Sequence, residues 1–204
     1  MPPQLDFSLM KSFFTSLLSE AQLWCIGQSW WWRVLLLGWF GIVFVGLLKN
    51  PQDANLFGMF NLCIHEMGHL IFAWGGHFLH VAGGTITQLA FPFLGMWNFY
   101  VQKDYFAISL CFGWLSTNLF NVSVYMADAR SMQLDLVSIG GPVYDHSLHD
   151  WHVLFGQMNL LPYDHVIAGF VWFLAVLSML MCFVMGAWLV WQMMTYKIPP
   201  TTSF

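Results

Sequence analysis

Long stretches without a charged side chain are the feature that most limits how this chain can fold. Residues 34–48, 105–127 and 166–195 contain no Asp, Glu, Lys or Arg and are rich in large apolar side chains. Only 8% of the whole chain is charged, against about 25% in a usual soluble domain. So little polar surface cannot cover a globule in water, whereas a helix of roughly 20 apolar residues crosses a bilayer. The sequence therefore predicts an α-helical polytopic membrane protein.

Two further segments raise the expected number of transmembrane helices to about five. Residues 54–74 form one of these spans, and the other runs to about Val101. Residues 8–24 place apolar and polar side chains on opposite sides of a helix, which predicts an amphipathic helix at the membrane surface or packed across the bundle. A sixth span results if this helix or residues 151–161 insert into the bilayer.

Two histidines and a glutamate lie within the apolar stretch "NLCIHEMGHLIFAW", residues 61–74. Ionisable groups inside a membrane span are costly, so they predict a functional site. On a helix, His65 and His69 lie one turn apart on the same face and can bind one ion, while Glu66 can reach a water on that ion. H-E-x-x-H on a helix is the arrangement of zinc hydrolases, with the carboxylate as general base. The alternative is a hydrogen-bonded pair of core histidines beside a neutral Glu66.

A catalytic zinc site usually takes a third protein ligand, and Asp128 is the strongest candidate. It follows the apolar stretch 105–127, so its charge must reach water or find a cation. An ion pair with Arg130 is the other reading of Asp128.

The polar segment "DHSLHDWHVLFGQMNLL", residues 145–161, offers alternatives for the third ligand in His149, Asp150 and His152. One of its carboxylates could instead orient a zinc histidine, or the segment could be a solvated loop. His77 and His80 are weaker candidates for metal binding.

The sequences "HEMGHLIFAWGG" and, after it, "AGGTITQL" resemble the site-2 protease family of intramembrane zinc metalloproteases, especially its small bacterial branch. The resemblance implies that His65 and His69 bind zinc and that Glu66 is the base. "LFN" at residues 119–121 resembles the start of the family's later motif, which puts Asp128 near the position of the third ligand. The implied location is the bacterial inner membrane, with several membrane passes.

The resemblance also implies a function and a substrate class. The expected activity is zinc-dependent hydrolysis of peptide bonds in membrane-spanning or membrane-attached proteins. Residues 81–88 contain paired glycines and no helical period, so we expect a short extended or re-entrant segment there. Its edge, with Gly83, Gly84, Thr85 and Thr87, would bind an unwound substrate by strand addition.

The domain organisation follows from these assignments. Residues 1–204 form a single integral membrane domain, in which residues 54–130 are the metal-site core. Residues 131–165 are a polar loop that carries the H-D-W-H segment, and residues 166–195 are the last transmembrane helix. The net charge of −4 comes without a basic block, which argues against a nucleic-acid partner.

Two other function classes remain open. The histidine spacings HxxxH, HxxH and HxxHxxH resemble the histidine boxes of membrane di-iron oxidases and lipid hydroxylases. Such an enzyme would need most of the histidines to converge on two metal ions. The third possibility is a zinc-binding membrane protein without catalytic activity.

Overall fold

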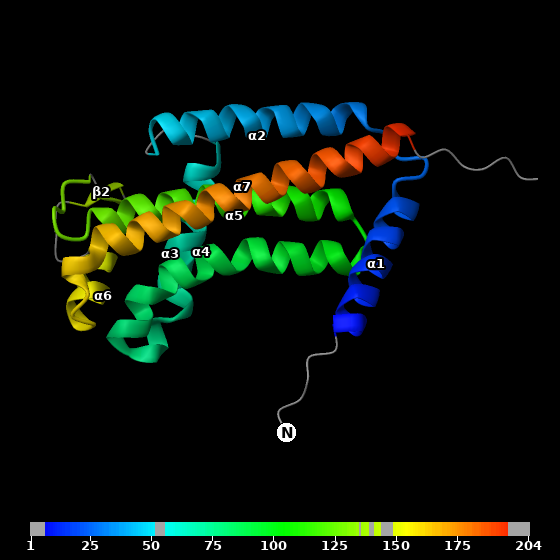
Figure 1. The fold of residues 1–204 in the computed structure, drawn as a ribbon. Helices are drawn as coiled ribbons and strands as arrows, with labels where there is room; N and C mark the ends of the chain where they lie inside the picture. Colours follow the sequence, from blue (N-terminus) through cyan, green and yellow to red (C-terminus); the bar gives the residue numbers. More distant parts are fainter. Residues whose placement is uncertain (1–6, 52–55, 135, 139–140, 144–148, 196–204) are drawn as a thin grey trace, which may run out of the picture.

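The computed structural model describes residues 7–51, 56–134, 136–138, 141–143 and 149–195. This part of the chain is helical apart from one short antiparallel hairpin, in which Leu136 pairs with Val143 (Figure 1). The elements are α1 (Phe7–Trp24), α2 (Trp31–Lys49), α3 (Leu56–Ile71), η1 (Ala73–Gly75), α4 (Gly76–Val101), α5 (Tyr105–Ala127), β1 (Leu136–Ser138), β2 (Gly141–Val143), α6 (Asp150–Gln157), η3 (Leu161–Tyr163) and α7 (Asp164–Thr195).

Three helical stretches in the described chain are long and apolar enough to cross a membrane: Trp31–Lys49, Tyr105–Ala127 and Leu161–Thr195. A fourth candidate is the pair α3 and α4, which bends by 47° between Ile71 and Ala73 and is therefore either a broken span or a re-entrant loop. The membrane-type helical bundle predicted from the sequence is therefore present. The predicted number of five or six spans is not confirmed.

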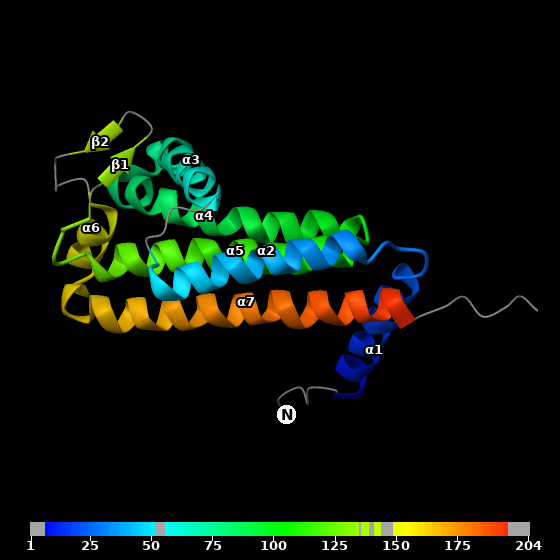
Figure 2. The same cartoon turned by 90° about the horizontal axis from the view of Figure 1, so that it is seen from above.

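The helices α4, α5 and α7 run alongside one another, and α2 lies over α5 and α7 (Figures 1 and 2). Small side chains and hydroxyl groups join α5 to α7: Ser116 donates to the carbonyl of Ala175, and Ser178 donates to that of Phe112, each at 2.7 Å. Such contacts let membrane helices approach closely without an apolar driving force. α1 crosses one end of the bundle, whereas α3, α6 and the hairpin gather at the other end.

Residues 81–88 are helical and lie within α4, so the prediction of an extended segment is wrong, whereas the re-entrant alternative stays open for the bent pair α3 and α4. Their small side chains allow α4 to pack tightly against α3. A Cβ atom added at Gly68 of α3 would lie 2.2 Å from the carbonyl oxygen of Gly83. The glycines therefore permit close contact between two helices and do not break α4.

Polar contacts fix α6 at the end of the bundle. The Nδ1 atom of His152 is 2.8 Å from the carbonyl oxygen of Ala129, just after α5. Arg130 donates to the buried carboxylate of Asp164 at 2.7 Å, which joins the same turn to the start of α7. These contacts hold the first residues of α6 beside the last turn of α5.

Candidate metal centre

His65, His69 and Asp150 form the one group among the described residues that is compact enough to hold a metal ion. Their possible ligand atoms all lie within 4.8 Å of one another. The Oδ2 atom of Asp150 is 2.9 Å from Nε2 of His65 and 3.4 Å from Nε2 of His69. The helix α3 presents the two imidazoles one turn apart, and α6 brings the carboxylate from a distant part of the sequence.

The other ring nitrogen of each histidine faces an oxygen acceptor. Nδ1 of His65 is 3.0 Å from the side-chain oxygen of Gln88, and Nδ1 of His69 is 2.8 Å from the carbonyl oxygen of His80. A carbonyl oxygen can only accept, so each Nδ1 carries a proton, which leaves Nε2 as the ring atom that could bind a metal ion. Hydrogen bonds of this kind orient metal-binding histidines and fix their tautomer.

Asp150 is the first residue of α6 and is buried. Burial raises the pKa of its carboxyl group, but the hydrogen bonds to His65 and His69 outweigh burial and hold the pKa below its ordinary value. Its backbone N–H donates to the hydroxyl of Tyr125 at 3.1 Å. The carboxylate is therefore ionised and held in place, as a metal ligand needs to be.

The donor atoms suit zinc. Two imidazole nitrogens and a carboxylate oxygen are common zinc ligands, and three protein ligands leave a coordination position for water or substrate. In a tetrahedral site with bonds of about 2.0–2.1 Å, neighbouring ligand atoms lie roughly 3.3 Å apart. The separations of 2.9 and 3.4 Å from the Asp150 oxygen are close to that value.

Asp128 does not belong to this group, in contrast to the prediction that it is the third ligand. Its carboxylate accepts hydrogen bonds from the Ser131 hydroxyl at 2.6 Å and from the backbone N–H groups of Gln133 and Leu134 at 2.9 and 3.0 Å. Those bonds outweigh burial and keep the pKa of Asp128 below its ordinary value. The carboxylate stabilises the turn after α5, and the alternative pairing with Arg130 is not made either, because Arg130 binds Asp164.

Of the three alternatives in the H-D-W-H segment, only Asp150 lies against His65 and His69. His149 and His152 make other contacts. His149 is buried, its Nδ1 accepts from the N–H of His152 at 3.2 Å, and its Nε2 lies 3.4 Å from Asp128. Burial lowers the pKa of His149 and outweighs the opposite effect of Asp128. The weaker candidate His80 contributes its backbone carbonyl, and its Nδ1 is 2.9 Å from the carbonyl oxygen of His69. His146 lies outside the described residues.

Glu66 is half-buried and follows His65 directly on α3. Within the part of the chain that the structure describes, its carboxylate makes no hydrogen bond or ion pair. Glu66 therefore directly follows a member of the candidate metal group in α3, and its carboxylate is not engaged by another described residue.

The residues predicted to bind an extended substrate have other positions. Gly84 lies directly against the imidazoles: an added Cβ would be 2.6 Å from Nε2 of His65 and 2.7 Å from Nε2 of His69. Gly83 contacts α3, and Thr85 and Thr87 are buried in α4. These four residues offer no strand edge, because helical hydrogen bonds already use their backbone groups.

Sequence reasoning missed Gln88 and Tyr125 as members of the site. Gln88 is a buried amide within an otherwise apolar helical stretch, and Tyr125 lies on α5 four residues after Asn121. A buried polar side chain in such a position needs a partner. That requirement could have marked Gln88 as a candidate, but it could not have shown that the partner is His65.

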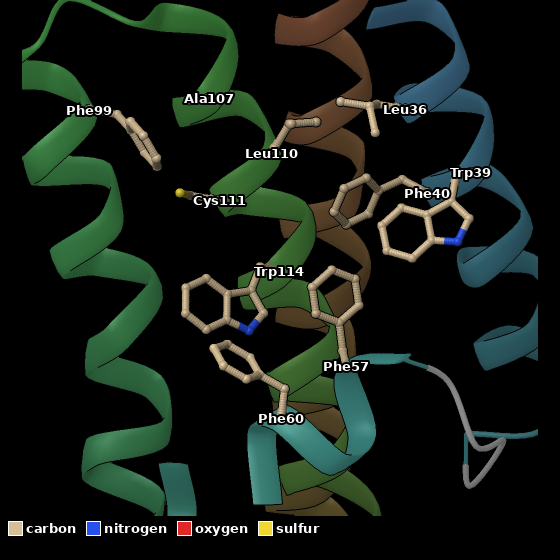
Figure 3. A pocket seen from close by; sticks show the side chains of 10 residues that line it. All are labelled: Leu36, Trp39, Phe40, Phe57, Phe60, Phe99, Ala107, Leu110, Cys111 and Trp114. Carbon is tan, nitrogen blue, oxygen red and sulfur yellow. The ribbon is translucent and has the colours of Figure 1, made fainter. Parts of the chain in front are cut away.

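An apolar pocket of about 300 Å³ lies apart from the candidate metal group (Figure 3). Residues of α2, α4 and α5 line it, with Phe57 and Phe60 of α3 at one end. The indole N–H of Trp114 in its wall donates to Asn61 at 2.8 Å, and Asn61 lies one helical turn before His65. None of the three metal-capable residues lines this pocket.

The substitution Gln88→Leu is expected to weaken zinc binding by about 10- to 100-fold, as is typical when a group that orients a metal-binding histidine is lost. Leucine removes the acceptor for Nδ1 of His65 and leaves that N–H buried. Competition with a zinc-sensitive chelating dye measures the affinity. Gln102→Leu, at the exposed position directly after α4, is the control and should bind zinc as the wild type does. Equal zinc affinity for Gln88→Leu and wild type would contradict the assigned role of Gln88.

Comparisons with models of protein families, with curated proteins and with solved structures found no match for this chain. The resemblance to the site-2 proteases therefore depends on the motif residues of the sequence alone.

Proposed function

We propose that this chain is an intramembrane zinc metalloprotease. The observation that supports this function most is the convergence of two Nε2 atoms and one carboxylate oxygen, from His65, His69 and Asp150, in a helical bundle of membrane type. Glu66, the base expected from H-E-x-x-H, lies next to them. A bound zinc ion would account for both this spacing and the oriented Nδ1 atoms.

In the proposed reaction the side chains have separate tasks. A zinc ion held there would lower the pKa of its water to about 7 and so supply a nucleophile at neutral pH. His65, His69 and Asp150 would hold the ion. The available carboxylate of Glu66 takes the proton of the attacking water and returns it to the leaving amine. Gln88 and the carbonyl of His80 keep the two imidazoles in their binding orientation.

The proposed substrate is a membrane-spanning or membrane-attached protein, and the proposed location is the bacterial inner membrane. His69 lies near the end of α3, at the bend between α3 and α4. Large apolar side chains are exposed on the outer faces of the spans, among them Leu35, Ile42 and Val184. Such surfaces suit contact with lipid and with apolar substrate segments.

The arrangement of the histidines favours the protease over the di-iron oxidase. His80 and His152 each direct Nδ1 to a backbone carbonyl, and His149 is engaged with His152 and Asp128. In the described residues the histidines do not gather around two adjacent metal positions. The next experiment distinguishes the protease from a zinc-binding membrane protein without catalytic activity.

The substitution Glu66→Gln is expected to abolish proteolysis without loss of zinc, because Glu66 is proposed as the base and not as a ligand. Cells that express the variant should accumulate at least one membrane protein that the wild type removes, as measured by quantitative proteomics of the membrane fraction. Glu20→Gln changes the only other glutamate of the chain, which lies in α1 and pairs with Lys103, and is the control.

If the wild type binds zinc and Glu66→Gln changes no membrane protein, the chain is a metal-binding protein and not a protease. If Glu66→Gln loses its zinc, Glu66 is needed for metal binding, and its assignment as a base that does not bind the metal is wrong.

A further inference from the structure

The aromatic ring of Tyr125 lies at the candidate metal centre. The centroid of its ring lies 4.3 Å from that of His149 and 6.4 Å from that of His65, and the Tyr125 and His65 rings are inclined by 65°. Tyr125 belongs to the last turns of α5, so it faces the group from a different helix than the three metal-capable residues. Its position is therefore fixed by packing on two sides.

The hydroxyl of Tyr125 has an unused donor. The oxygen accepts the backbone N–H of Asp150 at 3.1 Å, and the hydroxyl donates to no other residue in the described part of the chain. The N–H bond uses one lone pair of the oxygen, so the O–H hydrogen must point in another direction.

We propose that Tyr125 is a catalytic hydrogen-bond donor that binds the carbonyl oxygen of the scissile peptide bond. The inference rests on the proposed protease function. As water attacks the carbonyl carbon, negative charge collects on this oxygen, and a donor already fixed beside it stabilises that charge. The bond from Asp150 N–H makes the Tyr125 oxygen less able to accept and its O–H a better donor. No proton leaves Tyr125 in this step.

The alternative is that Tyr125 only supports the start of α6 through the Asp150 N–H. The two roles differ in what the hydroxyl does for a ligand at the metal. If the role is structural, the substitution lowers the affinity for the metal and for every ligand of the metal by a similar factor. If the hydroxyl is a donor, its removal lowers the affinity only for ligands that place a negatively charged oxygen near Tyr125.

The test uses the full-length chain in detergent with cobalt in place of zinc, because the visible bands of cobalt report both metal binding and ligand binding. Two probes are compared: acetohydroxamate, which binds through negatively charged oxygens, and imidazole, which binds through a neutral nitrogen. For Tyr125→Phe we expect unchanged cobalt content and a dissociation constant for acetohydroxamate that rises about tenfold or more. The constant for imidazole should stay within about twofold, since imidazole has no oxygen to accept the bond.

Tyr100→Phe, at the far end of α4, is the control and should leave both constants unchanged. Replacement of Tyr125 by 4-fluorophenylalanine keeps the volume of the side chain without the donor, so it gives the same test if Tyr125→Phe folds poorly. Equal affinities in variant and wild type, or a parallel loss for both probes, would overturn the inference. If the wild-type chain takes up no cobalt, the proposed function fails as well, and this result is distinct from the other two.

Discussion

The purified variant Asp150→Asn is expected to bind zinc about 1,000-fold or more weakly than the wild type. Loss of a residue that only orients a ligand typically weakens binding 10- to 100-fold, and loss of a residue that binds the metal directly should weaken it more. Asparagine keeps the shape of the side chain but loses the negative charge that lies 2.9 Å from Nε2 of His65 and 3.4 Å from Nε2 of His69. Titration against a chelator of known affinity measures the change.

Asp128→Asn is the matched control for this experiment. Its carboxylate stabilises the turn that includes Ser131, Gln133 and Leu134 and is not part of the metal-capable group. We expect a smaller loss of zinc affinity, transmitted through His149 and the position of α6. If Asp128→Asn loses more zinc than Asp150→Asn, the third ligand is Asp128, as the motif of the site-2 proteases implies.

The substitution Gly84→Ala is expected to abolish stoichiometric zinc binding. The added methyl group would lie 2.6 and 2.7 Å from the Nε2 atoms of His65 and His69, far inside van der Waals contact. Both imidazoles would have to move, and metal sites require their ligands within about 0.5 Å of the productive geometry. Atomic emission on the purified protein gives the zinc content per chain.

Gly169→Ala in α7 is the control for the glycine substitution. A Cβ at Gly169 meets no atom within 4 Å, so this variant should keep its zinc and fold as well as the wild type. Full zinc content in Gly84→Ala would mean that the imidazoles do not bind a metal beside Gly84.

The local parts of the fold and site could be predicted from the sequence because they depend on composition and helical period. The charge-free stretches 105–127 and 166–195 correspond to α5 and most of α7. The spacing of His65 and His69 places both on one face of α3, as the structure shows. Neither prediction needs knowledge of which helices meet.

The third member of the group could not be chosen from the sequence. Asp150 is 85 residues from His65, and their contact depends on how α6 packs against the end of α5. The resemblance favoured Asp128, although the motif lacks its usual proline and Ala129 stands where the family has glycine. The hydrogen bonds of Asp128 within its own turn are a property of the folded loop.

The helix over residues 81–88 also depends on tertiary structure. Paired glycines and two threonines have low intrinsic helix propensity, so the local sequence favoured an extended segment. Packing outweighs that preference, because Gly83 and Gly84 are the residues that let α4 approach Gly68 and the two histidines. Paired glycines occur both in extended segments and where two helices pack closely. The sequence alone does not distinguish these two cases.

The central claim is that one zinc ion is bound by His65, His69 and Asp150 inside the bundle. X-ray absorption spectroscopy at the zinc edge, on the wild-type chain purified from its membrane with its metal content measured, tests this claim most directly. We predict about one zinc per chain, with two imidazole nitrogens and oxygen ligands at about 2.0–2.2 Å. A folded and active chain without bound metal, or one with two irons, would contradict the account.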